Sequence, residues 1–192
     1  MRNRGCMSAG TIGIALLVIA AILFFWGKNG YNSFTTKEQN VNTKWSNVET
    51  VYQKRANLIP NLERTVKSYS QFEQETLTKV IEARSKATSM TIDPTNMTEA
   101  DMAKFQAAQG ELSGALSRLM AVVEQYPNLK ADQQYMNFQR EYTAIENSIR
   151  SETVYYNEAA QDYNTSIKTF PNNILANFTN FKEKPHFKAA AR

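Results

Sequence analysis

Three charged side chains stand where helical periodicity expects buried ones. Arg55, Glu73 and Glu152 fall in stripes of apolar residues that recur every three to four positions. A charge removed from water is costly unless a group of opposite sign pairs with it. Two interpretations are open: the charges pair across a helical bundle and fix its register, which is the better attested use, or they line a polar groove for a partner. We expect Arg55 to pair with Glu152 or with another inward carboxylate.

Histidine and cysteine are too scarce for the common catalytic and metal sites. The chain has one of each, Cys6 and His186. A di-iron site in a helical bundle needs Glu-x-x-His pairs on two helices, and a structural zinc site needs several cysteine or histidine ligands. Nucleophilic triads also need a paired histidine, and no GxxxxGK[ST] phosphate loop occurs. We therefore expect a protein that is not an enzyme and that carries no metal or cofactor.

The formal charge of +4 comes from the two ends of the chain. Arg2 and Arg4 precede the first apolar segment, and residues 182–192 are basic, whereas the region between them is close to neutral. A nucleic-acid-binding domain normally shows a basic stripe on a folded face. We therefore expect no nucleic-acid partner.

An uncharged stretch near the N-terminus is long enough to cross a bilayer. Residues 5–27 carry no charge, and about 23 residues of helix span about 35 Å, more than a bilayer core. Trp26 and Lys28 are the expected anchors at the membrane interface. No A-x-A cleavage site follows, so we expect an uncleaved signal-anchor with a single pass. The positive charges of Arg2 and Arg4 favour a domain outside the cytoplasm.

The rest of the sequence has the pattern of helices. Apolar side chains recur at alternating four-residue and three-residue steps over 36–89, 98–126 and 129–170, and a shorter segment covers 173–181. Thr98 is the expected N-cap of the second helix. Short connections imply antiparallel neighbours. We expect an all-α fold: an N-terminal transmembrane helix followed by an elongated antiparallel up-and-down bundle of three long helices and a short C-terminal helix.

The domain boundaries follow from these elements. We expect a transmembrane signal-anchor at 1–28, a helical bundle at 29–181 and a basic, flexible tail at 182–192. Pro60 interrupts the first bundle helix without changing the phase of its stripe. A proline inside a helix removes one backbone hydrogen bond and bends the helix. The segment is therefore either one kinked helix or two helices stacked nearly end to end, and we expect the kinked helix.

Several short motifs follow one another in order along the chain. Arg-Ala-Asn-Leu-Ile-Pro-Asn-Leu at 55–62 is similar to an R-x-x-L-I-P-N-L stretch, and it is followed by Glu-x-Tyr-Pro-x-Leu-Lys-Ala at 124–131, Tyr-Asn-Glu-Ala at 156–159 and Phe-Pro-Asn at 170–172. In these motifs the chain resembles the LemA family of bacterial membrane proteins over nearly its whole length. It departs from the family at Thr-Val-Tyr, 153–155, where basic residues are usual. An anionic ligand bound by such residues is therefore not expected here.

The resemblance implies a single-pass anchor in the bacterial inner membrane, carrying an antiparallel bundle with no established catalytic role. It adds Asn57, Pro60, Asn61 and Arg84 to the stripe charges as candidate interaction positions. We expect a non-enzymatic scaffold or adaptor of the cell envelope that presents its bundle to protein partners. Two alternatives are open. One is a structural protein that assembles as a homo-oligomer through coiled-coil-like stripes. The other is a sensor that binds a ligand at the buried charges.

Overall fold

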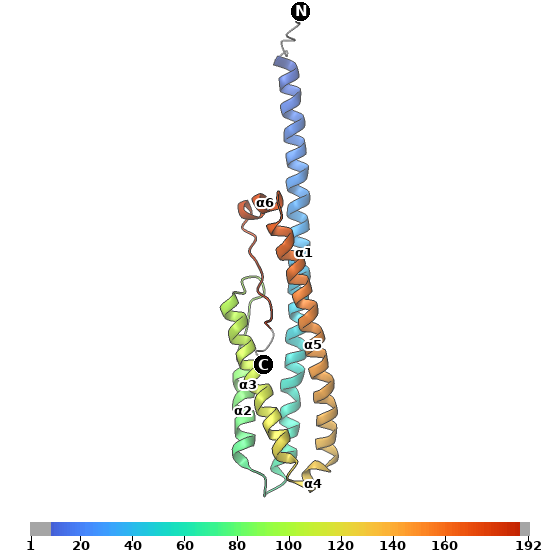
Figure 1. The fold of residues 1–192 in the computed structure, drawn as a ribbon, viewed down its shortest axis with the longest axis vertical. Helices are drawn as coiled ribbons and strands as arrows, with labels where there is room; N and C mark the ends of the chain where they lie inside the picture. Colours follow the sequence, from blue (N-terminus) through green and yellow to red (C-terminus); the bar gives the residue numbers. More distant parts are fainter. Residues whose placement is uncertain (1–8, 189–192) are drawn as a thin grey trace, which may run out of the picture.

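One helix joins the apolar N-terminal segment to the bundle. The computed structural model describes residues 9–188, and its first helix, α1 (Ala9–Lys67), runs unbroken for 59 residues (Figure 1). Within this part of the chain, α1 is the one helix long and apolar enough to cross a membrane. The apolar segment and the bundle therefore share a single helix. Residues 1–8 and 189–192, and with them Arg2, Arg4 and Cys6, lie outside the described residues.

The prediction of a single kinked helix over 36–89 is wrong. Helix α1 passes through Pro60 and ends seven residues later, the chain reverses over 68–73, and α2 (Gln74–Thr88) returns beside α1 (Figure 1). The apolar stripe stays in phase across this reversal because both helices turn their apolar sides toward the same core. Periodicity identifies a buried face, but it does not identify a change of direction.

The reversal is fixed by one aromatic side chain on each side of the turn. The Tyr69 hydroxyl donates a hydrogen bond to Asp132 Oδ2 at 3.0 Å, which ties the turn to the start of α5. Phe72 is buried in the bundle core, and its ring contacts that of Tyr126 in a tilted arrangement, with 5.2 Å between the ring centroids. These contacts join residues about 60 positions apart, so no local sequence pattern announces them.

The remaining helices confirm the all-α prediction. Thr98 caps the next helix through a reciprocal capping box with Asp101, as its sequence predicts. The described residues form six helices and no strand; the last four helices are α3 (Glu99–Val123), α4 (Pro127–Lys130), α5 (Gln133–Lys168) and α6 (Asn172–Phe178). In Figure 1 α1 and α3 descend while α2 and α5 ascend, which is the expected antiparallel arrangement.

Two apolar clusters fill the bundle, and a polar layer separates them. The distal cluster, far from the apolar segment, includes Ile59, Leu62, Leu77, Leu112, Leu116 and Tyr135. The proximal cluster, nearer to that segment, includes Phe34, Trp45, Phe105, Tyr156 and Tyr163. Arg55 lies between the two clusters along α1, and the residue is 2% exposed. The predicted stripes therefore form the core, with one buried charge at the boundary.

The C-terminal segment covers the side of the proximal cluster that α2 is too short to reach. Helix α2 accompanies only the distal half of the bundle, and residues 89–98 and 179–188 run along the proximal half (Figure 1). The prediction of a flexible tail is wrong for residues 182–188, because Lys184 is 4% exposed and Phe187 packs against the proximal cluster. Residues 189–192 lie outside the described part of the chain.

Candidate functional site

Arg55 is a buried cation whose two terminal nitrogens form hydrogen bonds, whereas its Nε is buried without a hydrogen-bond partner. Its Nη1 donates to Glu146 Oε1 at 3.0 Å, and its Nη2 donates to Oε1 and to the backbone O of Gln109, at 2.7 and 3.0 Å. Its guanidinium also lies over the Tyr52 ring, 5.0 Å from the centroid. The partner is thus another inward carboxylate, Glu146 rather than Glu152. These bonds join α1, α3 and α5 at one level of the bundle.

The other two stripe charges do not join this cluster. Glu73 is exposed at the N-cap of α2, because the chain reverses just before it, so its predicted place in the core is wrong. Glu152 is half-buried on α5, and its Oε2 is buried without a hydrogen-bond partner. The structure therefore keeps one of the three predicted buried charges as a bundle-spanning contact.

The positions added by the family resemblance are spread along α1 and α2. Asn57 and Asn61 are exposed and accept hydrogen bonds from neighbours on their own helix, Gln53 and Arg64. Pro60 is half-buried inside α1. These three residues form no common site.

Two further predicted groups have separate roles. The Arg84 Nε donates to the backbone O of Ala56 at 2.9 Å and so joins α2 to α1. Trp26 is half-exposed and Lys28 exposed on the part of α1 that lies between the apolar segment and the bundle. This is the position expected of residues at a membrane interface.

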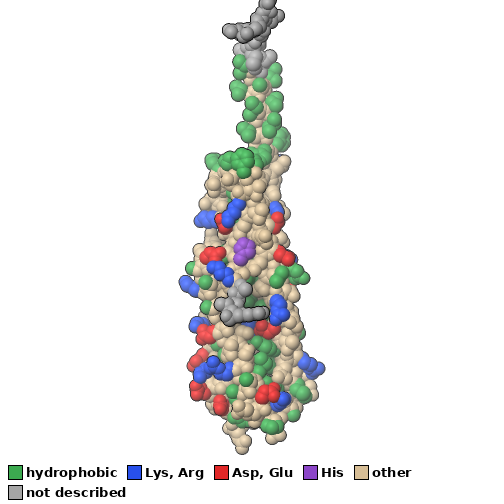
Figure 2. Space-filling model, in the orientation of Figure 1, with side chains coloured by type: hydrophobic (Ala, Val, Ile, Leu, Met, Phe, Trp, Pro, Cys, Tyr) green, Lys and Arg blue, Asp and Glu red, His purple; other side chains and the backbone are tan. Residues whose placement is uncertain are grey.

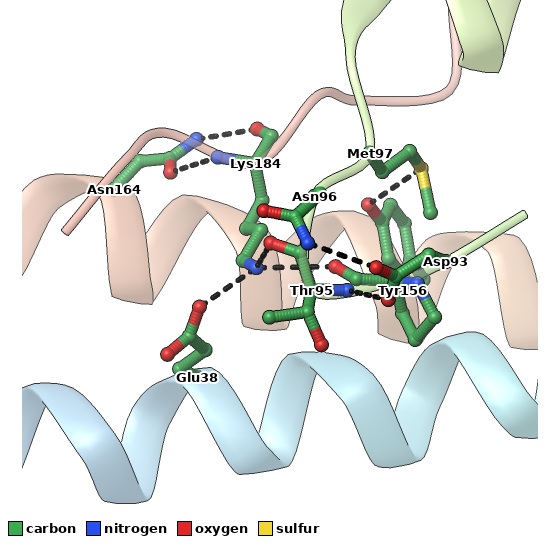
Figure 3. A network of polar contacts seen from close by, with 9 residues as sticks. Glu38, Asp93, Thr95, Asn96, Met97, Tyr156, Asn164 and Lys184 are labelled. Atoms are coloured by element: carbon green, nitrogen blue, oxygen red, sulfur yellow. Dashed lines mark hydrogen bonds and ion pairs between the residues drawn. The ribbon is translucent and has the colours of Figure 1, made fainter.

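The most elaborate polar site surrounds a residue that the sequence assigned to a flexible tail. Lys184 Nζ contacts Glu38 Oε1 at 2.8 Å and donates to the backbone oxygens of Thr95 and Pro94, at 2.8 and 3.1 Å (Figure 3). Asp93 shapes the loop that presents these oxygens, because its carboxylate accepts from the Thr95 backbone N at 2.9 Å. The lysine charge is therefore buried with one carboxylate and two carbonyl oxygens.

Three side-chain amides hold the backbone of the tail. Each one donates through its NH₂ group to a backbone oxygen and accepts from the backbone N of the same tail residue. The pairs are Asn164 with Lys184, at 2.8 and 2.8 Å, Asn157 with Phe187, at 3.1 and 2.8 Å, and Gln106 with Lys188, at 2.9 and 3.3 Å. A side-chain amide presents one donor and one acceptor, just as a peptide group does. The tail is thus bound through its main chain as a non-helical segment along the bundle.

An aromatic pocket receives the next large tail side chain. The Phe187 ring stacks on Trp45 of α1, with 5.9 Å between centroids, and meets Tyr156 of α5 and Phe105 of α3 at 5.5 and 6.3 Å. Offset-stacked and edge-to-face rings at these distances attract one another. The Tyr156 hydroxyl also donates to the backbone O of Pro185 at 2.9 Å. Burial raises the pKa of Tyr156, so this hydroxyl stays protonated and remains a donor.

We call these groups together the tail site: Glu38, Trp45, Phe105, Gln106, Tyr156, Asn157, Asn164 and the oxygens of Pro94 and Thr95. Trp45, Phe105 and Tyr156 fall within the segments whose apolar stripes predicted the core, but sequence reasoning missed the site. The signal available was weak: Asn157 and Asn164 lie seven residues apart, two turns of helix, on the buried side of α5. The tail that they bind carries no helical repeat.

An apolar patch lies beside the point where α1 leaves the bundle. Phe170, Ile174 and Phe178 are 76%, 59% and 89% exposed, at four-residue intervals, and Figure 2 shows green side chains gathered at that end of the bundle. We call these three residues the collar. The collar belongs to α6 and the turn before it, which pack on α1: the Phe181 ring lies 5.4 Å from both Tyr31 and Phe34.

Close packing fixes the collar next to the apolar segment. A Cβ atom added at Gly30 would come within 2.6 Å of Leu175 Cδ2, so the glycine allows α6 to approach α1 closely.

No group of three or more His, Cys, Asp or Glu side chains within residues 9–188 could hold a metal ion.

Comparison with known proteins agrees with the fold. The model of the LemA family matches residues 44–192. The magnetosome protein MamQ 2 of Paramagnetospirillum magneticum is 29% identical over 97% of this chain and 74% of its own length. Protein LemA of Metamycoplasma hominis is 27% identical over 85% of this chain and 71% of its own length. With the apolar helix, these relatives indicate a membrane-associated helical protein. The chain belongs to the LemA family, as its motifs predicted.

Proposed function

We propose that this protein is a non-enzymatic scaffold of the bacterial inner membrane that holds protein partners at a set height above the bilayer. One observation carries the proposal: α1 continues from the apolar segment to the far end of the bundle without a linker. The 40 residues from Lys28 to Lys67 make a helix about 60 Å long. A partner bound to the bundle around this helix is confined near the membrane surface, and this confinement raises the partner's effective concentration without any new contact.

The collar supports an upright stance on the membrane. Gly30, which packs against α6, lies four residues beyond Trp26, or about 6 Å along the helix axis. The headgroup layer on each side of a bilayer is about 5–8 Å thick. The collar therefore lies at headgroup level, where an exposed apolar helix face buries itself at the acyl boundary. We propose that α6 rests on the bilayer and limits the tilt of the bundle.

The two alternative functions receive less support from the described residues. Lateral pairing through the stripes needs exposed apolar seams, but the α1 stripe residues Val41, Val48 and Leu62 are at most 1% exposed within the chain itself. Ligand binding at the buried charges needs a free charged group, but Arg55 is already bonded to Glu146 and Gln109. A scaffold needs neither feature.

A hollow on the surface of the bundle is suited to a protein partner. At the distal end, α3 and α5 enclose a shallow hollow of about 950 Å³ whose lining includes Met120, Met136 and Tyr142. Met136 is 39% exposed. Methionine side chains adapt to irregular partners, and for that reason they are common at protein-binding surfaces.

Photocrosslinking in intact cells tests the proposal. A photoreactive amino acid at Met136 should capture the same protein reproducibly, whereas one at Glu141, an exposed polar position on the same helix, should not. The captured protein should also leave the membrane fraction when the gene for this chain is deleted and return when the gene is restored. Absence of a reproducible product, or a captured protein whose membrane fraction is unchanged by the deletion, contradicts the scaffold proposal.

A further inference from the structure

The tail is bound in the way that proteins bind a separate peptide. Residues 182–188 form no backbone-to-backbone hydrogen bond with the rest of the described chain. Their main chain is instead held by the side-chain amides of Asn164, Asn157 and Gln106. In extended-peptide recognition, main-chain hydrogen bonds supply affinity and pockets for individual side chains supply specificity. The tail site has both features.

Two pockets of different chemistry define what the site accepts. The first is acidic and polar: Glu38 and the oxygens of Pro94 and Thr95 surround an ammonium group. The second is aromatic and receives the ring of Phe187. Of the two intervening residues, Pro185 is buried and its backbone O accepts from Tyr156, whereas His186 is half-buried. The selected pattern is therefore a lysine followed three residues later by phenylalanine.

The neighbouring tail side chains do not enter the site. Lys182 and Glu183 are exposed, and the ion pairs of Glu183 with Lys168 and of Lys188 with Glu99 lie at the surface. Exposed ion pairs contribute little to binding. Specificity thus rests on Lys184 and Phe187.

We propose that the tail site is a binding site for an extended peptide of a partner protein with the pattern Lys-x-x-Phe, and that the chain's own residues 184–187 occupy it as an intramolecular ligand. The tail follows α6 and shares no backbone-to-backbone hydrogen bond with the helices, so we expect its release to leave the helices in place. A partner segment of the same pattern competes with the tail for the site. This inference rests on the proposed scaffold function in one respect, namely that the partner is a protein.

The test uses the full chain in lipid nanodiscs and a fluorescent peptide with the sequence of residues 182–188. In a Lys184→Ala, Phe187→Ala chain, which we call the emptied chain, the tail lacks both side chains that fill the pockets and should leave the site. A Lys182→Ala, Glu183→Ala chain is the matched control with an intact tail. We expect the emptied chain to bind the peptide at least tenfold more tightly than the wild type or the control, by fluorescence anisotropy. In the wild type the competing tail lowers the fraction of free sites and therefore the apparent affinity. A peptide with alanine at both key positions should not bind.

Hydrogen exchange provides a second measurement that needs no variant. Excess peptide should displace the tail of the wild-type chain and speed exchange at the backbone amides of Lys184 and Phe187, whereas the alanine peptide should not. If the emptied chain fails to fold, this result alone decides the proposal.

Two outcomes overturn the peptide site. One is a folded emptied chain that does not bind the peptide, together with unchanged exchange in the wild type. The other is exchange of tails between two copies without binding of free peptide, which assigns the site to a second copy of this chain. Neither result bears on capture at Met136, so failure of the peptide site and failure of the scaffold are distinguishable.

Discussion

Replacing Arg55 by methionine tests whether the polar layer between the two core clusters stabilises the bundle. The substitution keeps an unbranched apolar stem but shortens the side chain and removes three hydrogen bonds to Glu146 and Gln109. The Gln109 side chain, in a residue 7% exposed, loses the donor to its Oε1, which costs about 1–3 kcal/mol. The Glu146 side chain is 30% exposed and can be hydrated again, so the loss of its ion pair adds less to the destabilisation. We expect Arg55→Met to lower the free energy of unfolding by about 2–4 kcal/mol.

A double-mutant cycle separates the ion pair from the loss of packing. Glu146→Gln should destabilise the wild-type chain and have almost no effect in the Arg55→Met background, giving a coupling energy of about 1 kcal/mol or more. Glu152→Gln is the matched control on the same helix, and it should show no coupling because Glu152 does not contact Arg55. The assay is urea unfolding of the full chain in detergent micelles, followed by far-ultraviolet circular dichroism.

Two results would refute this reasoning. The first is an unchanged denaturation midpoint for Arg55→Met, which would mean that the polar layer contributes nothing to stability. The second is coupling of Arg55 to Glu152 in place of Glu146, which would mean that the helices adopt a different register.

Three further predictions concern a cap, a helix contact and the oligomeric state. Hydrogen bonds from the Thr98 side chain and backbone lower the pKa of Asp101 below its ordinary value of 3.8. The stabilisation of the fold by these hydrogen bonds is therefore present above pH 3.8 and is lost as the pH falls through the folded-state pKa. Thr98→Ala should therefore lower the melting temperature at neutral pH, and an equal difference from wild type at pH 3 contradicts this. Gly30→Leu should push α6 away from α1 and speed proteolysis near Phe178, whereas an unchanged cleavage pattern would show that the contact tolerates a side chain. Light scattering should find a monomer in micelles because the stripes are buried within each chain; a stable dimer would favour self-assembly.

The apolar pattern predicted the core well but not the path of the chain. Val80 and Ala83 are buried as their stripe requires, yet they belong to a separate helix, α2, and not to a continuation of α1. A stripe records which residues face the core, and that record is the same for one helix and for two helices joined by a turn. Glu73 was misplaced for the same reason, because it lies at the reversal.

The tail site depended on contacts that no local pattern contains. Lys184 meets Glu38 and the 94–95 loop, and Phe187 meets Trp45, all far apart in sequence. A short basic segment without periodicity has the composition of a mobile end. Its order comes from partners on three helices, and only the fold brings these partners together.

The depth of the collar in the bilayer decides whether the bundle stands upright on the membrane. A spin label replaces Phe178 in one sample and Tyr155 in another, with the full chain in lipid nanodiscs. Tyr155 is also exposed, but its ring lies beneath Lys44, whose position on α1 is about 27 Å beyond Trp26. We predict that lipid-dissolved oxygen relaxes the label at 178 more strongly than water-soluble nickel does, and that the label at 155 shows the reverse. Nickel dominance at both positions would place α6 in water and contradict the account.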